Sequence, residues 1–122
     1  MSRTIDILDR LIAFETVSAQ SNLGLIDYVE ALLTSCGGRV TRLSDPQEPK
    51  AGLYAAFGPE GRGVVLSGHS DVVPVTGQAW TCPPFQLTSS GDRLYGRGTT
   101  DMKGFVASML SAAEKASQMT LR

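Results

Sequence analysis

Two short polar stretches hold the side chains best suited to bind a metal ion. The first, GHSDVVP (68–74), places the chain's single histidine, His69, two residues before Asp71. Residues two apart in extended backbone point to the same side. His69 could therefore bind a metal while Asp71 holds the ligand set in orientation, as supporting carboxylates do. The alternative is a partly buried histidine beside an unrelated surface aspartate.

The second stretch, GRGTTDMKGF (96–105), places Asp101 in a glycine-flanked loop before a predicted helix. A carboxylate there can bridge two cations with its two oxygens, and Gly96 and Gly98 would let the backbone come close to such a site. The alternative is that Asp101 is the N-cap of that helix. The pattern is not a dinucleotide-binding fingerprint, because the third glycine and the preceding long strand are missing.

The elements that must position these stretches follow from hydrophobic periodicity. Helices are predicted over 4–17, 23–36 and 102–117, and strands over 39–43, 53–57, 64–66, 85–88 and 93–95. The second helix should end at Gly37-Gly38, because glycine accepts the left-handed conformation at a helix C-terminus. The strand 64–66 is apolar throughout and is expected to be buried. This order of elements indicates an α/β layer architecture.

On the last predicted helix, Phe105, Met109 and Ala113 lie on one face, with Val106 and Leu110 beside them. Ligands of open α/β sheets bind outside the carboxyl ends of strands. Because GHSDVVP follows the predicted strand 64–66, we expect His69 at such a strand end.

Composition narrows the classes of function. The 122 residues are 42% hydrophobic and 19% charged, with a formal net charge of −1, as in a folded domain. No basic stripe supports nucleic-acid binding, and no apolar run approaches the roughly 20 residues that cross a membrane. The amino terminus is unlike a signal peptide, so we expect a cytoplasmic protein. Cys36 and Cys82 are then expected to be free thiols.

Taken together, GHSDVVP, the pattern W-x-x-x-P-F from Trp80 to Phe85, and GDRLYGRGTTDMKGF (91–105) resemble metallopeptidase family M20. This family contains acetylornithine deacetylases, succinyl-diaminopimelate desuccinylases, carboxypeptidases and dipeptidases. The motif TTDMKGF is most like that of acetylornithine deacetylases, whereas desuccinylases more often read AADMKG.

The resemblance implies an α/β fold, the amino-terminal part of a zinc-peptidase-like catalytic domain with a mixed sheet flanked by helices. It implies that His69 binds one of two zinc ions, that Asp101 bridges both, and that Asp71 supports the metal site and catalysis. Co²⁺ is a possible substitute for Zn²⁺ in such a mixed nitrogen-oxygen site. The peptide bond between Asp101 and Met102 is often cis in the family.

The activity implied is hydrolysis of N-acetylornithine to ornithine and acetate, a step of arginine biosynthesis. The substrate would be a small-molecule N-acyl amino acid, and the full-length parent would be a homodimer. Residues 1–122 would form only the amino-terminal portion of the catalytic domain. The family's general base, its other metal ligands and its lid and dimerisation domain are expected outside this sequence, so we expect the chain alone to bind zinc weakly and to be inactive.

Other interpretations stay open at this point. The parent could be a succinyl-diaminopimelate desuccinylase or an M20 peptidase, and the chain could instead be a truncated, non-catalytic binding module. Trp80 and Phe85 are expected to anchor the long loop 74–84 by packing. Arg97 and Lys103 are expected to face either substrate or solvent.

Overall fold

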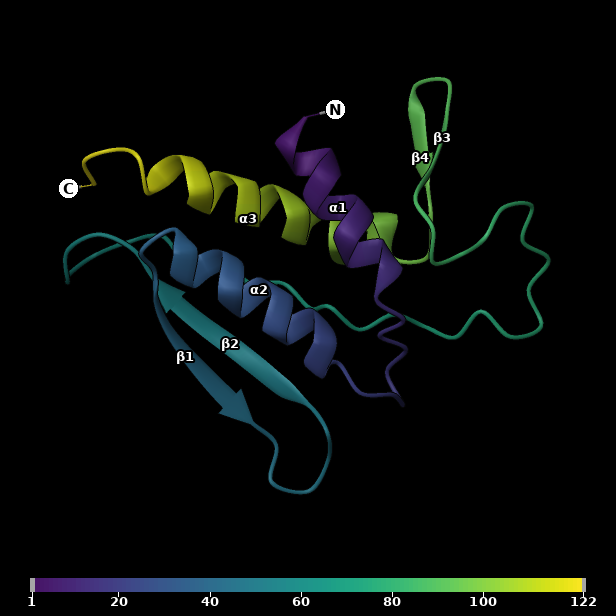
Figure 1. The fold of residues 1–122 in the computed structure, drawn as a ribbon, viewed down its shortest axis with the longest axis horizontal. Helices are drawn as coiled ribbons and strands as arrows, with labels where there is room; N and C mark the ends of the chain where they lie inside the picture. Colours follow the sequence, from purple (N-terminus) through teal and green to yellow (C-terminus); the bar gives the residue numbers. More distant parts are fainter. Residues whose placement is uncertain (1, 122) are drawn as a thin grey trace.

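The computed structural model describes residues 2–121, which form three helices and two small antiparallel sheets (Figure 1). The elements are α1 (Arg3–Ala13), α2 (Leu23–Ser35), β1 (Arg39–Ser44), β2 (Ala51–Ala56), β3 (Thr88–Ser90), β4 (Arg93–Tyr95), a π-helical turn η1 (Thr99–Lys103) and α3 (Gly104–Ala116). Strand β1 pairs with β2, and β3 pairs with β4. The predicted α/β class is confirmed.

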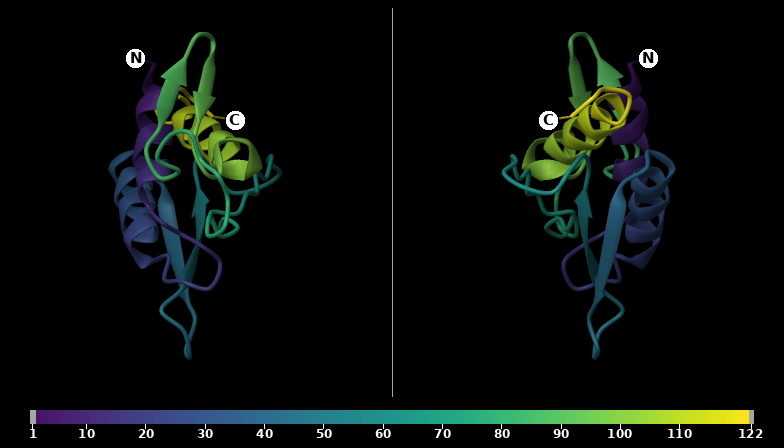
Figure 2. Two further views of the ribbon diagram at one scale, coloured as in Figure 1. Left: turned by 90° about the vertical axis from the view of Figure 1, so that its right-hand side faces the viewer. Right: turned by 90° about the vertical axis from the view of Figure 1, so that its left-hand side faces the viewer.

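The core lies where α1 packs on α3 and where α2 packs on the β1–β2 hairpin (Figure 2). Its most deeply buried apolar side chains are Ile7, Leu11, Ile12, Ala107 and Leu110. Within residues 2–121, no helix has both the length and the apolar character needed to cross a bilayer.

Helix α2 ends as its sequence predicts. Gly37 adopts a left-handed conformation with φ of +78°. The Gly37 N–H donates to the Thr34 carbonyl (2.9 Å) and the Gly38 N–H to the Leu33 carbonyl (3.0 Å). These two bonds make a Schellman motif, which satisfies carbonyls that the helix end would leave unpaired. The motif directs the chain from α2 into β1.

The predicted strand 64–66 is wrong. Val64, Val65 and Leu66 are 88%, 80% and 52% exposed, and no residue of this segment belongs to a strand. A strand needs a neighbour for its backbone N–H and C=O groups. Among the described residues each strand pairs only within its own two-stranded sheet, so none offers this segment a partner. The segment is instead part of the extended trace that runs from β2 towards the long loop (Figure 1).

The end of α1 and the buried face of α3 both depend on contacts with other elements. Helix α1 ends at Ala13, not at Val17, because Phe14 adopts extended backbone and leads the next residues towards Val72. On α3 the buried face carries Val106, Ala107, Leu110 and Ser111. Of the apolar residues that the sequence places together on this helix, Val106 and Leu110 are buried and Phe105 is 43% exposed. Helix α1 packs against α3, and this contact determines which side of α3 is buried.

Lys103 faces neither substrate nor solvent, contrary to both expectations from sequence. Its side chain is fully buried, and Nζ donates to the carbonyls of Leu11 (2.8 Å) and Phe14 (2.7 Å). These carbonyls lie at the C-terminal end of α1, where backbone acceptors lack partners within the helix and favour a cation. Burial lowers the pKa of Lys103 to about 8, so the amine still carries its proton at neutral pH. Lys103 therefore caps the C-terminal end of α1, although it lies about ninety residues later in the sequence.

Replacing Lys103 with methionine is expected to destabilise the chain. Methionine fills similar apolar space but gives the two carbonyls no donor, and a buried acceptor left without a partner costs about 1–3 kcal/mol. Chemical denaturation at pH 7 measures the free energy of unfolding. The control Lys115→Met changes an exposed lysine of α3 and should alter stability by less than about 0.5 kcal/mol. Equal stability of Lys103→Met and the parent chain would contradict the capping role.

Candidate metal centre

The segment that carries His69 is held beside the end of α1. Val17 and Val72 form a parallel bridge, in which the Val72 N–H donates to the Thr16 carbonyl at 2.9 Å. The buried Thr16 hydroxyl donates to the Ser70 carbonyl at 2.6 Å. These bonds fix the backbone on either side of Asp71.

The segment that carries Asp101 reaches the same place through Gly98. Gly98 has a φ of +88°, and a Cβ added there would lie 2.6 Å from Val72 Cγ1. Only glycine permits both this conformation and this close approach. The glycine thus lets the two motif stretches meet.

Asp101 is not the N-cap of α3, the alternative that its position left open. Lys103 occupies the N-cap position and makes no side-chain capping bond. Asp101 has extended backbone, with φ of −129° and ψ of 94°, inside the η1 turn. The peptide bond that follows it, to Met102, is cis, as the family resemblance predicted.

The three predicted site residues meet through the imidazole of His69. His69 Nε2 lies 3.0 Å from Asp101 Oδ1. His69 Nδ1 lies 3.1 Å from the Asp71 carbonyl and 3.1 Å from Asp71 Oδ1. One ring nitrogen therefore faces each aspartate, and the alternative of an unrelated surface aspartate fails for Asp71.

Ser18 extends this chain of contacts, and the sequence analysis missed it. Its hydroxyl donates to Asp71 Oδ2 at 2.5 Å. Ser18 stands in a polar segment after the first helix, and no spacing within the sequence links it to Asp71. The tertiary bridge between Val17 and Val72 is what brings the two together.

The contacts among these groups shift the pKa values of Asp71 and His69. The Ser18 hydrogen bond holds the pKa of Asp71 below its ordinary value, with His69 adding to the effect. Partial burial lowers the pKa of His69, but the bonds to Asp101 and Asp71 outweigh it and leave the pKa above 6.5. In the metal-free chain the two aspartates thus stabilise the protonated form of the imidazole.

The donor set fits two of the ligands of a zinc ion. Histidine nitrogen and carboxylate oxygen are zinc ligands, and at metal–ligand distances of about 2.0–2.1 Å two tetrahedral ligands lie about 3.3 Å apart. The 3.0 Å between His69 Nε2 and Asp101 Oδ1 is close to this separation. Nδ1 faces Asp71, which is the usual arrangement of a metal-binding histidine. Residues 2–121 contain no group of three or more His, Cys, Asp or Glu side chains arranged to hold an ion, so the fit is that of a partial site.

A hollow of about 240 Å³ lies over these groups. Its lining includes Ser18, His69, Asp71, Arg97 and Asp101. The side chains of His69 and Asp101 are 48% and 84% exposed, so both are open to an approaching ion. Arg97 was expected to face substrate or solvent, and it lies in the wall of this hollow.

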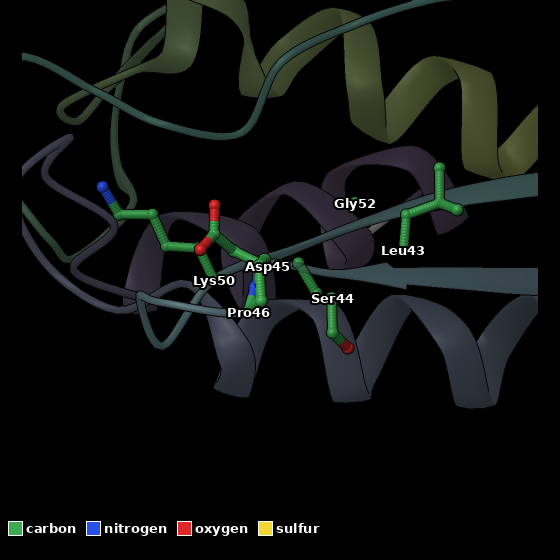
Figure 3. A pocket seen from close by; sticks show the side chains of 7 residues that line it. Leu43, Ser44, Asp45, Pro46, Lys50 and Gly52 are labelled. Carbon is green, nitrogen blue, oxygen red and sulfur yellow. The ribbon is translucent and has the colours of Figure 1, made fainter.

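A larger hollow of about 360 Å³ lies at the turn that connects β1 to β2 (Figure 3). It has one carboxylate in its lining, Asp45, and no histidine. That carboxylate already accepts the N–H groups of Gln47 (2.7 Å) and Glu48 (2.9 Å) within its own turn. The Asp45 carboxylate therefore stabilises its own turn. His69 and the two aspartates beside it remain the candidate metal site.

Replacing Asp101 with asparagine is expected to lower the pKa of His69. The substitution removes the negative charge beside Nε2, while the bonds from Nδ1 to Asp71 remain. NMR titration of the metal-free chain measures this pKa without overlap, because His69 is its single histidine.

The control Asp92→Asn changes a carboxylate that is 98% exposed in the β3–β4 turn, and it should leave the His69 pKa unchanged. Because folding raises the pKa of His69, the stability from its contacts is fully present below pH 6.5 and is lost as pH rises through the folded value. Identical titration curves for Asp101→Asn and the parent chain would rule out the contact.

Comparison with known proteins shows which proteins this chain is similar to. Residues 65–122, which include His69, Asp71 and Asp101, match Peptidase family M20/M25/M40. The chain is 42% identical, over 92% of its length, to acetylornithine deacetylase of Myxococcus xanthus. It is 41% identical, over 88% of its length, to succinyl-diaminopimelate desuccinylase of Orientia tsutsugamushi (strain Ikeda). It covers 30% and 28% of these two relatives.

A solved structure supports the same assignment. The crystal structure of human carnosine dipeptidase 1 matches 94% of this chain with a TM-score of 0.78 at 26% identity, and the match covers 28% of that chain. Sequence and fold therefore agree in their likeness to peptidase family M20/M25/M40.

Proposed function

We propose that this chain is part of a metal-dependent amide hydrolase that converts N-acetylornithine to ornithine and acetate. The observation that carries the proposal is the meeting of His69 Nε2 and Asp101 Oδ1 at 3.0 Å, with Asp71 behind the imidazole. The match to a peptidase family supports the class of bond, and the likeness to acetylornithine deacetylases supports the substrate.

His69 and Asp101 would hold the metal, and Asp101 has a second carboxylate oxygen for a second ion. A pair of zinc ions, when bound, supplies a polarised substrate carbonyl and a water that is acidic near neutral pH. The chain's own residues position these groups. His69 presents Nε2 because Asp71 accepts from Nδ1, and Ser18 holds Asp71 in place.

Asp71 is a positioning residue in this proposal, not the base that removes a proton. An effective general base has a pKa near the working pH. The Ser18 bond holds the pKa of Asp71 below its ordinary acidic value, which makes it a poor proton acceptor at neutral pH. The base would come from another carboxylate of a complete family protein, since this chain covers less than a third of its relatives.

A second candidate is removal of a succinyl group from N-succinyl-diaminopimelate. The 41% identity to a desuccinylase, about equal to that of the deacetylase, favours it. The two reactions share the site and differ in the acyl group. A homodimeric assembly and a cytoplasmic location also stay predictions.

The substrate test compares N-acetylornithine, N-succinyl-diaminopimelate and a dipeptide, in the presence of Zn²⁺ or Co²⁺. It uses the 122-residue chain and any longer natural protein that contains it. We expect no turnover by the chain alone and the highest kcat/KM on N-acetylornithine in the longer protein. A preference for N-succinyl-diaminopimelate would favour the second candidate, and metal-independent turnover would contradict both.

The residue test uses Asp71→Asn in the longer protein. Asparagine keeps the shape of the side chain but weakens its hold on His69 Nδ1. Loss of such a supporting carboxylate typically costs about 10–100-fold in activity or metal affinity. Asp92→Asn, at the exposed turn, should retain full activity. An Asp71→Asn protein as active as its parent would contradict the proposed role.

A further inference from the structure

Arg97 is the one arginine in the lining of the hollow above His69 and Asp101, and its surroundings fix it in place. Its N–H donates to the Pro84 carbonyl at 2.6 Å. Gly96 and Gly98 on either side pack closely, and an added Cβ would lie 3.0 Å from Ile12 at the first and 2.6 Å from Val72 at the second. The tightly packed backbone therefore fixes the position of the Arg97 Cα.

The guanidinium of Arg97 is held by neutral groups. Its central carbon lies 5.0 Å from the centroid of the Trp80 ring. One terminal nitrogen donates to Gln78 Oε1, and the Trp80 indole N–H donates to that same oxygen at 3.1 Å. Trp80, expected to be a packing anchor, thus serves as the stacking surface for Arg97. Stacking orients a guanidinium and leaves its N–H edges available to a planar anion.

The charge of Arg97 has no carboxylate partner among residues 2–121. Arg3 pairs with Glu114, and Arg42 pairs with Asp27 and Glu30. No such pair includes Arg97, and its Nε is buried without a hydrogen-bond partner in the described part of the chain. An oriented guanidinium that has no carboxylate partner and lies in the wall of a hollow is suited to an incoming anion.

We infer that Arg97 binds a carboxylate of the substrate and so places the substrate amide at His69 and Asp101. A carboxylate can accept two parallel N–H bonds from one guanidinium. The inference rests on the proposed function for the identity of the ligand, an N-acyl amino acid. It adds that the site selects substrates with a free carboxylate.

Trp80 allows this to be tested without turnover, because it is the only tryptophan in the chain and it stacks on Arg97. Its fluorescence is titrated with N-acetylglycine and with N-acetylglycinamide, which lacks the negative charge, at one ionic strength. We expect a saturable change with N-acetylglycine and at least about ten-fold weaker binding of the amide, since bonds to charged groups are the stronger ones.

Two variants assign the effect to Arg97. Arg97→Met should remove the preference for the carboxylate, and Arg97→Lys should retain part of it, since an ammonium keeps the charge but not the planar pair of donors. The control Arg93→Met changes an exposed arginine of β4 and should behave as the parent chain. If Arg97→Met fails to fold, the parent's preference and Arg97→Lys still decide.

Equal responses to N-acetylglycine and its amide in the parent chain, or an undiminished preference in folded Arg97→Met, would overturn the inference. Hydrolysis in the substrate test tests the proposed function separately. Turnover of N-acyl amino acids without a carboxylate-specific Trp80 response would leave the proposed function standing and overturn the role of Arg97. A carboxylate-specific response without turnover by the longer protein would support the carboxylate site and overturn the proposed function.

Discussion

The buried ammonium of Lys103 is the contact on which the geometry of the site depends. It joins the end of the first helix to a loop about ninety residues later, through bonds to the carbonyls of Leu11 and Phe14 at 2.8 and 2.7 Å. Asp101 stands two residues before this lysine. The contact between Lys103 and the helix end therefore positions the Asp101 carboxylate.

The same helix end also positions His69. Phe14 leaves the helix in extended backbone, and the residues that follow it bridge to Val72. Ser18 then reaches Asp71, and Asp71 faces one nitrogen of the imidazole. The second nitrogen is left for Asp101 or for a metal. The C-terminal end of α1 thus positions both His69 and Asp101. A shift of α1 would therefore displace both residues.

His69, Asp71 and Asp101 could be named from the sequence because they lie in two short motifs that together resemble a known family. The structure brings both aspartates within hydrogen-bond distance of His69, and the roles of the three residues at a metal stay predictions. The roles of Ser18 and Lys103 could not be predicted, because both depend on which distant backbone atoms the fold brings near. A lysine in a glycine-rich loop has no sequence feature that distinguishes a helix cap from a surface charge.

The fold likewise contains elements that the local sequence predicts and elements that depend on distant contacts. Helix α2 and its glycine cap were predicted because periodicity and a left-handed glycine are properties of the segment itself. The strand 64–66 was not, because strand formation requires a partner, and apolar composition alone does not supply one. Likewise, the buried face of α3 depends on where α1 lies, which periodicity within α3 does not specify.

The described residues 2–121 bring His69 Nε2 and Asp101 Oδ1 to 3.0 Å, where both are proposed to bind a metal. This is measured by calorimetric titration of the chain with Zn²⁺, beside His69→Ala and the exposed-site control Asp92→Asn. We expect weak binding by the parent chain and by Asp92→Asn, and no binding by His69→Ala. Absence of binding by the parent chain, or binding that His69→Ala leaves unchanged, would show that His69 and Asp101 do not form a metal site in this chain.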